Sequence, residues 1–220
     1  MAHYKFGGKL RFQADAFLFD LDGTLINSIA VVNRVWSQWA IDNGLDPVEV
    51  VANCHGRRSL DTIKLFAPHL PQPQANDEFI DREAADTDGL KVLPGAIEFL
   101  KSLPPDRWAI VTSCTTKLAK VRMEFLNIPQ PKVIVVGDDV TSGKPDPQGF
   151  LMAANKLGFP PKNCIVFEDA PAGIEAGQRA GMKVVTVTAV NSHTDKGDVF
   201  IRDYQSVKLV STSPLVIDTF

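Results

Sequence analysis

The side chains that could carry chemistry gather in four short segments of the chain, each on the C-terminal side of an apolar run. They comprise carboxylates, hydroxyls and one lysine: Asp20, Asp22 and Thr24; Thr112 and Ser113; Lys144; and Glu168 and Asp169. Clustered carboxylates repel one another unless a cation lies among them, and carboxylate oxygens are ligands that Mg²⁺ prefers. A lysine and a hydroxyl suit the oxygens of a phosphate group. If the fold brings the four segments together, the pattern predicts a magnesium site that binds phosphate.

The elements that must position these residues alternate along the chain. Short, almost wholly apolar runs predict buried strands at residues 16–19, 108–111, 133–136, 165–167, 184–187 and 207–210. Apolar residues at helical spacing predict helices between them at residues 28–43, 94–103, 115–126, 147–157 and 171–180. In the helix 115–126 we expect an inward face made of Leu118, Val121, Phe125 and Leu126. Apolar strands separated by helices are typical of a parallel sheet covered on both faces, which is a doubly wound α/β fold.

In an open parallel sheet, ligands bind beyond the carboxyl ends of the strands. The four segments are therefore expected at one edge of the sheet. The stretch between the first two strands is too long for a single crossover and must contain an inserted helical unit. We expect a catalytic core made of residues 1–28 and 92–220, with residues 29–91 forming a small α-helical cap domain.

The same residues resemble the signatures of the haloacid dehalogenase-like superfamily. The segment 20–25, DLDGTL, resembles the first signature, and Ser113, Lys144 and the segment 168–173 resemble the second, third and fourth in order. Four signatures in the right order are far more specific than one. The resemblance covers nearly the whole chain and implies a Rossmann-like core with a helical cap.

The resemblance also implies an activity. The segment 55–61 is similar to the cap of sugar and polyol phosphatases, including glycerol phosphatases and 2-deoxyglucose-6-phosphate phosphatases. We therefore expect a Mg²⁺-dependent phosphatase that hydrolyses a small sugar or polyol phosphate through an aspartyl-phosphate. The alternatives are a phosphosugar mutase resembling β-phosphoglucomutase and, from another class, a phospho-aspartate receiver domain. A dehalogenase is disfavoured because Asp22-Gly23-Thr24 is the phosphotransfer version of the motif.

Each residue then receives an expected role. Asp20, at the strand tip, is the nucleophile, and Asp22 is the general acid and then the general base. Asp20 and Asp169 are expected metal ligands, and the resemblance adds the backbone carbonyl of Asp22. Glu168 is either a further ligand or a hydrogen-bonding partner of a metal-bound water.

The phosphate group is expected to contact a second set of residues. Ser113 donates a hydrogen bond with help from the backbone N–H of Cys114, whose own side chain is expected to be a spectator. Thr112 competes with Ser113, because strand alternation lets only one of them face the site; the family pattern favours Ser113. Lys144 bridges the nucleophile and the phosphate as a point charge. Thr24 contributes a hydroxyl that orients the loop or caps a helix.

Substrate specificity is expected from the cap. Arg58 is favoured as a substrate contact because a guanidinium suits phosphate or clustered hydroxyls. His55 is an even choice between a contact and a solvated turn, and Arg57 is expected to be exposed. Trp36 and Trp39 fit a helix face that packs between cap and core, although stacking on a sugar is an alternative.

Composition excludes several other classes. The net charge of -3 lacks the basic excess that nucleic-acid binding normally requires, and no apolar run is long enough to span a bilayer. Cys54, Cys114 and Cys164 are scattered and odd in number, which predicts reduced thiols rather than a disulfide framework or a zinc site. We expect a cytoplasmic monomer whose partner is a small phosphorylated substrate, without nucleic acid or membrane.

Overall fold

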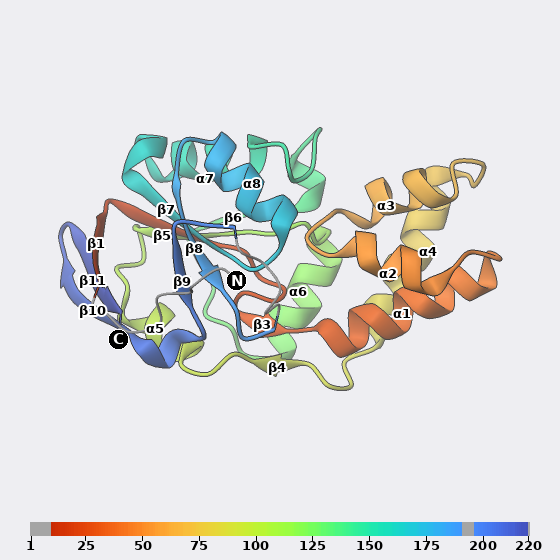
Figure 1. Cartoon of the computed structure of the whole chain (residues 1–220), viewed down its shortest axis with the longest axis horizontal. Helices are drawn as coiled ribbons and strands as arrows, with labels where there is room; N and C mark the ends of the chain where they lie inside the picture. The colour runs from red at the N-terminus through yellow and green to blue at the C-terminus, as the bar shows by residue number, and fades with distance from the viewer. Residues whose placement is uncertain (1–9, 191–195, 220) are drawn as a thin grey trace, which may run out of the picture.

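A computed structural model describes residues 10–190 and 196–219, so the first nine residues of the expected core lie outside the described residues. A six-stranded parallel sheet with strand order β6-β5-β2-β7-β8-β9 runs through the middle of the molecule (Figure 1). Its strands are β2 (Ala16–Phe19), β5 (Trp108–Val111), β6 (Val133–Val135), β7 (Cys164–Glu168), β8 (Lys183–Val187) and β9 (Val199–Ile201). The first strand of this sheet in the sequence, β2, lies in its middle. The next two strands, β5 and β6, lie on one side of β2, and β7, β8 and β9 lie on the other. The change of direction between β2 and β7 creates the switch point where ligands bind in such folds.

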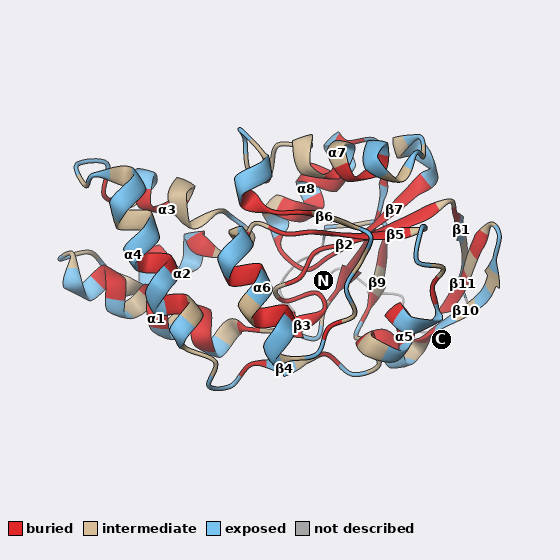
Figure 2. Ribbon diagram, turned by 180° about the vertical axis from the view of Figure 1, so that it is seen from behind, coloured by how far each residue is buried: buried red, intermediate tan, exposed pale blue. Residues whose placement is uncertain are grey.

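Helices cover both faces of this sheet. Helices α7 (Gln148–Leu157) and α8 (Pro171–Arg179) lie on one face, and α5 (Ala96–Ser102) and α6 (Thr116–Phe125) lie on the other (Figure 1). Their buried sides point toward the strands, which are themselves buried almost throughout (Figure 2). The doubly wound α/β fold predicted from the apolar runs is therefore confirmed.

An aromatic cluster lies under the end of β2. Phe19, the last residue of the strand, stacks on Phe167 of β7 with ring centroids 4.7 Å apart. Phe99 and Tyr204 stack on one another at 5.5 Å and extend the cluster, and all four rings are buried. Because large rings pack with defined geometry, the cluster gives Asp20, the next residue along the chain, a rigid base.

Four helices are inserted between the two halves of the core. They are α1 (Ile29–Asp42), α2 (Pro47–Cys54), α3 (Ser59–Phe66) and α4 (Gln72–Ala85). They enter and leave through β3 (Ile26–Asn27) and β4 (Lys91–Val92), which pair with one another in antiparallel fashion. In Figure 1 the four helices project from one end of the core. We call α1–α4 the helical insertion; its status as a separate domain of residues 29–91 stays a prediction.

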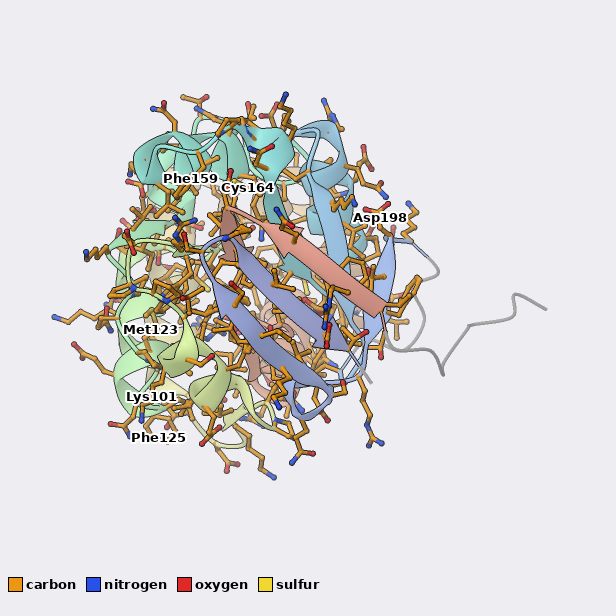
Figure 3. The ribbon with its side chains drawn as sticks, turned by 90° about the vertical axis from the view of Figure 1, so that its left-hand side faces the viewer. Lys101, Met123, Phe125, Phe159, Cys164 and Asp198 are labelled. Atoms are coloured by element: carbon orange, nitrogen blue, oxygen red, sulfur yellow. The ribbon has the colours of Figure 1, made fainter. Side chains whose placement is uncertain are left out.

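A second sheet lies at the opposite end of the molecule. Strands β1 (Leu10–Ala14), β10 (Val207–Thr212) and β11 (Leu215–Thr219) form this antiparallel sheet, with β11 in the centre. Figure 3 looks onto it. The predicted strand 207–210 thus exists, but it belongs to this sheet. Short 3-10 helices at Gly137–Asp139, Pro161–Asn163 and Tyr204–Ser206 complete the described elements.

Helix α6 faces the core differently from the prediction. Phe125, expected to point inward, is 53% exposed and is labelled near the molecular surface in Figure 3. The buried positions of α6 are Leu118, Ala119, Arg122 and Met123. A charged residue, Arg122, therefore occupies the inward face, where two carboxylates contact it.

None of the helices described is both long enough and apolar enough to cross a membrane.

The aromatic cluster yields a stability prediction. Replacing Phe167, which is fully buried, by alanine should lower the free energy of unfolding by about 3–5 kcal/mol, because a cavity replaces a packed ring. Phe125→Ala is the matched control and should change the free energy of unfolding by about 0.5 kcal/mol or less, since that ring is largely in water. Urea titration of both variants measures the difference. Equal losses would mean that the cluster adds no special stability.

Candidate active site

The four chemically active segments meet at one edge of the parallel sheet. Asp20 follows β2, Thr112 follows β5, Lys144 lies in the loop after β6, and Glu168 ends β7. The Lys144 ammonium donates hydrogen bonds to Asp20 Oδ1 at 2.6 Å and to Glu168 Oε1 at 2.8 Å. It also donates to the backbone carbonyl of Val111 at 3.1 Å. One buried cation thus joins the ends of three strands.

Three buried carboxylates lie close enough to share a metal ion. Asp20, Glu168 and Asp169 each offer an oxygen within 4.8 Å of the others. Burial raises the pKa of Asp20 to about 7, against the attraction of Lys144 and with the help of Glu168 and Asp22. Burial, Glu168 and Asp20 also raise the pKa of Asp169. Lys144 alone therefore does not balance the cluster, and a divalent cation fits it because it would favour the ionised carboxylates.

Close packing holds Asp169 in this cluster. Thr24 Oγ1 donates a hydrogen bond to Asp169 Oδ1 at 3.2 Å. Gly23 lies directly against the same carboxylate: with φ at +86°, a Cβ on it would come within 2.1 Å of Asp169 Oδ2. Only glycine suits both the backbone conformation and the contact. The Thr24 hydroxyl thus contacts the acidic loop, and both its expected role in orienting that loop and its contact with phosphate stay predictions.

Glu168 has its oxygens occupied by the protein. Oε1 accepts from Lys144, and Oε2 accepts from the backbone N–H groups of Asp169 and Ala170 at 2.8 and 2.9 Å. These contacts fix the start of α8 and hold the lysine in place. Both roles expected for Glu168, a metal ligand and a hydrogen-bonding partner of a metal-bound water, stay predictions.

Asp22 points to a different partner from Asp20. Its Oδ1 lies 2.7 Å from Arg122 Nη1, in an ion pair that lacks the alignment of a hydrogen bond. Its Oδ2 accepts from the thiol of Cys114 at 2.9 Å. The Cys114 side chain thus contacts a proposed catalytic residue, and its expected role as a spectator stays a prediction. Its backbone N–H donates to Thr112 Oγ1 at 3.1 Å, and its assistance to phosphate stays a prediction.

A cavity separates the helical insertion from the core, and Asp20 and Asp22 both line it. Thr112 and Ser113 are both among the lining residues, and which of their hydroxyls faces a bound phosphate stays a prediction. Ser113 Oγ donates to the backbone carbonyl of Gly56 in the insertion at 3.0 Å. The remaining walls include Trp36, His55, Arg57, Glu83 and Arg122.

Gly56 allows the insertion to approach this closely. Its φ is +73°, and a Cβ would come within 2.6 Å of the Cβ of Ala170 in the core. His55, beside it, lines the cavity and lies 3.0 Å from the side-chain oxygen of Asn33 through Nε2. Burial lowers the pKa of His55, although Asp22 opposes the shift, so the ring offers a neutral hydrogen-bonding edge to the cavity at neutral pH.

Arg58 is placed outside that cavity. Its Nε and Nη2 contact the two carboxylate oxygens of Asp61 at 2.7 and 2.9 Å. Nη1 and Nη2 donate to the core carbonyls of Val140 and Thr141 at 2.8 and 3.2 Å. The guanidinium thus ties the insertion to the loop after β6. Its substrate contact stays a prediction, while the exposed Arg57 beside it does line the cavity.

Sequence reasoning missed Arg122 and Glu83. Glu83 of α4 is only 6% exposed and Arg122 of α6 only 3%. Glu83 lies in the apolar stripe of α4, next to Phe79 and Ile80. Arg122 lies in the apolar stripe of α6, next to Leu118. Opposite charges on two apolar stripes are a signal that the helices pack together through a buried pair. Trp36, foreseen as a packing residue, packs in a tilted arrangement against Phe79 with ring centroids 4.0 Å apart, and it also lines the cavity.

Comparisons with known proteins agree with this geometry. Residues 14–181 match the family model described as haloacid dehalogenase-like hydrolase. The chain is 42% identical to hexitol phosphatase A of Escherichia coli over 178 residues, which covers 79% of this chain and 82% of that protein. It is 34% identical to glycerol-1-phosphate phosphohydrolase 2 of Saccharomyces cerevisiae, covering 91% of this chain and 86% of that one. A crystal structure of β-phosphoglucomutase from Clostridium difficile superposes with a TM-score of 0.75 at 23% identity, covering 89% and 93% of the two chains.

The raised pKa of Asp20 predicts a pH dependence of stability without metal. Between about pH 4, the ordinary value for an unfolded aspartate, and about pH 7, the folded state binds more protons than the unfolded state. The free energy of unfolding of the wild type should therefore fall with rising pH relative to that of Asp20→Asn. Urea titration in a chelating buffer at several pH values measures this difference.

The control for that measurement is Asp106→Asn, which alters an exposed carboxylate and should differ from the wild type by a constant amount. Adding Mg²⁺ should remove the fall, because a bound cation favours the ionised carboxylates. A difference between the wild type and Asp20→Asn that does not change over this pH range would contradict the electrostatic account of the site.

Proposed function

Because the chain belongs to the haloacid dehalogenase-like hydrolase family, we propose that it is a Mg²⁺-dependent phosphatase acting on a sugar or polyol phosphate. The observation that carries the proposal is the buried cluster of Asp20, Glu168 and Asp169 with Lys144. Asp20 and Asp169 of this cluster line the same cavity as Asp22. The cluster suits the transfer of a phosphoryl group, and the names of the two phosphatase relatives indicate the substrate class.

The chemistry is divided between the two aspartates that line the cavity. Asp20 attacks phosphorus, a bond from its carboxylate oxygen to phosphorus forms, and the bond to the leaving alcohol breaks as Asp22 donates a proton to the departing oxygen. Water then attacks the aspartyl-phosphate while Asp22 takes its proton, which releases phosphate and restores Asp20.

The surrounding residues prepare those steps. Lys144 orients the Asp20 carboxylate through its hydrogen bond to Oδ1, and Ser113 with the backbone N–H of Cys114 donates hydrogen bonds to the phosphoryl oxygens. Asp20, Asp169 and the backbone carbonyl of Asp22 would hold Mg²⁺, which supplies charge stabilisation to the transferred group. The insertion covers the cavity, which limits the access of water.

The alternatives differ in their support. The likeness to β-phosphoglucomutase is below a quarter in sequence identity and shows the fold alone, so it adds nothing for a mutase. A receiver domain is not favoured, because the family match extends over residues 14–181 and four helices are inserted after the first catalytic segment.

We further propose that the protein works in the cytoplasm as a monomer, with a small phosphorylated substrate as its partner and without nucleic acid or membrane. The three cysteines are free thiols and all are buried, which suits a reducing compartment. The net charge of -3 offers no attraction to nucleic acid.

The proposed nucleophile gives the direct test. With Mg²⁺ present, the wild type should release inorganic phosphate from glycerol 1-phosphate, and exhaustive chelation should stop it. Asp20→Asn should fold but show no turnover, because an amide cannot attack phosphorus. Phosphate release and circular dichroism measure the two properties. Turnover by a verified Asp20→Asn protein would refute the assignment.

Arg58 and Arg57 allow a matched test of specificity. Arg58→Ala should lower kcat/KM by about tenfold for glycerol 1-phosphate and p-nitrophenyl phosphate alike, because Arg58 ties the insertion to core carbonyls. Arg57→Ala should affect mainly the polyol substrate, since Arg57 lines the cavity. Steady-state kinetics at fixed Mg²⁺ decides. A loss confined to glycerol 1-phosphate in Arg58→Ala would support the substrate contact that the sequence favours instead.

A further inference from the structure

A single buried guanidinium links the proposed proton donor to the helical insertion. Arg122 of α6 lies 2.7 Å from Asp22 Oδ1 through Nη1 and donates from Nη2 to Glu83 Oε1 at 2.7 Å. Glu83 belongs to α4 of the insertion, and Asp22 to the loop after β2. Contacts of side chains therefore run without a break from the insertion to the reacting end of the core.

Burial makes this arrangement depend on all of its members. Arg122 and Glu83 are almost fully buried, and removing one partner of such a pair leaves a charge without compensation. Burial lowers the pKa of Arg122, but Asp22, Cys114 and Glu83 outweigh it and leave the pKa raised. The guanidinium is thus always charged and always attracts both carboxylates.

The geometry fixes where the Asp22 carboxylate points. Arg122 holds one oxygen and the Cys114 thiol holds the other, while Arg122 Nη1 also lies 3.1 Å from Cys114 Sγ. Asp22 lines the cavity, and each of its carboxylate oxygens is engaged by one of these two side chains. Arg122 in turn keeps its own position through Glu83, so displacement of α4 would release one of its two carboxylate contacts.

We propose that Arg122, held by Glu83, is the positioning residue that aims Asp22 at the leaving-group oxygen, so that proton transfer requires the insertion to be docked on the core. This inference rests on the proposed phosphatase activity. In the step concerned, the bond between phosphorus and the leaving oxygen breaks, the oxygen keeps the electron pair, and Asp22 gives it a proton. Arg122 touches Asp22 and takes no part in bond making.

A substrate whose leaving group needs no proton can separate a loss of Asp22 positioning from a general loss of structure at the active site. Departure of p-nitrophenolate does not require protonation, whereas the alkoxide of glycerol 1-phosphate does. The burst of p-nitrophenolate after rapid mixing reports formation of the aspartyl-phosphate without the acid. Turnover of glycerol 1-phosphate needs Asp22 twice, to protonate the leaving oxygen and to take the proton of the attacking water. The burst rate and the turnover rate, both measured with Mg²⁺, should therefore respond differently when the Asp22 carboxyl loses its orientation.

Three variants test the proposal. Arg122→Lys keeps the charge but loses the fork that spans two carboxylates, and it should lower kcat for glycerol 1-phosphate about a hundredfold. Glu83→Gln keeps the shape and should lower it about tenfold. In both, KM and the burst rate should stay within about twofold of the wild type. Lys117→Met is the matched control: it removes an exposed pair with Asp81 between the same two helices and should change neither signal.

Each other result has a defined meaning. Equal losses in burst and turnover would overturn the proposal in favour of a structural role. A raised KM for glycerol 1-phosphate with unchanged kcat would overturn it in favour of substrate binding. The same loss in Lys117→Met would mean that any pairing of α4 with α6 suffices. Should Arg122→Lys fail to melt cooperatively, Glu83→Gln decides alone. A wild type that released no phosphate would refute the proposed function itself, whereas every preceding result assumes an active wild type.

Discussion

The electrostatic repulsion among carboxylates that are buried close together is the constraint on which the rest of this structure depends. Asp20 and Asp22 stand two residues apart, yet each has its own buried cation, Lys144 for the first and Arg122 for the second. Each cation also contacts a second carboxylate, Glu168 or Glu83. Asp169 accepts a hydrogen bond from the uncharged hydroxyl of Thr24. A metal ion bound between Asp169 and Asp20 would complete the balance of charge.

The two cations divide the site into halves that depend on different parts of the chain. The half around Lys144 is built from strand ends alone, because β2, β5 and β7 supply its partners. The aromatic cluster of Phe19 and Phe167 makes those ends rigid. The half around Arg122 needs α4 of the insertion. Under the proposed mechanism, the nucleophile is therefore held by the sheet, whereas the proton donor is held by a contact between the core and the insertion.

How much the sequence could predict follows the same division. Apolar runs fall directly before Asp20 and Glu168, so the strands and their catalytic ends were readable from local pattern. Pairing between Leu10 and Thr219, at opposite ends of the chain, leaves no local signal, and the second sheet was missed. The inward face of α6 was misjudged because only apolar residues were considered for it, and the charged Arg122 was passed over. Only the approach of Glu83 and Asp22 from elsewhere makes it a core residue.

The contacts that join the insertion to the core differ in the distance over which they act. Gly56 meets Ser113 through one neutral hydrogen bond, and Arg58 meets backbone carbonyls of the core. Both act over the length of a hydrogen bond and vanish once it breaks. The attraction between Glu83 and Arg122 is a charge interaction in a medium of low dielectric, where it falls off slowly with distance. The charged contact is the one suited to make the readiness of Asp22 depend on closure.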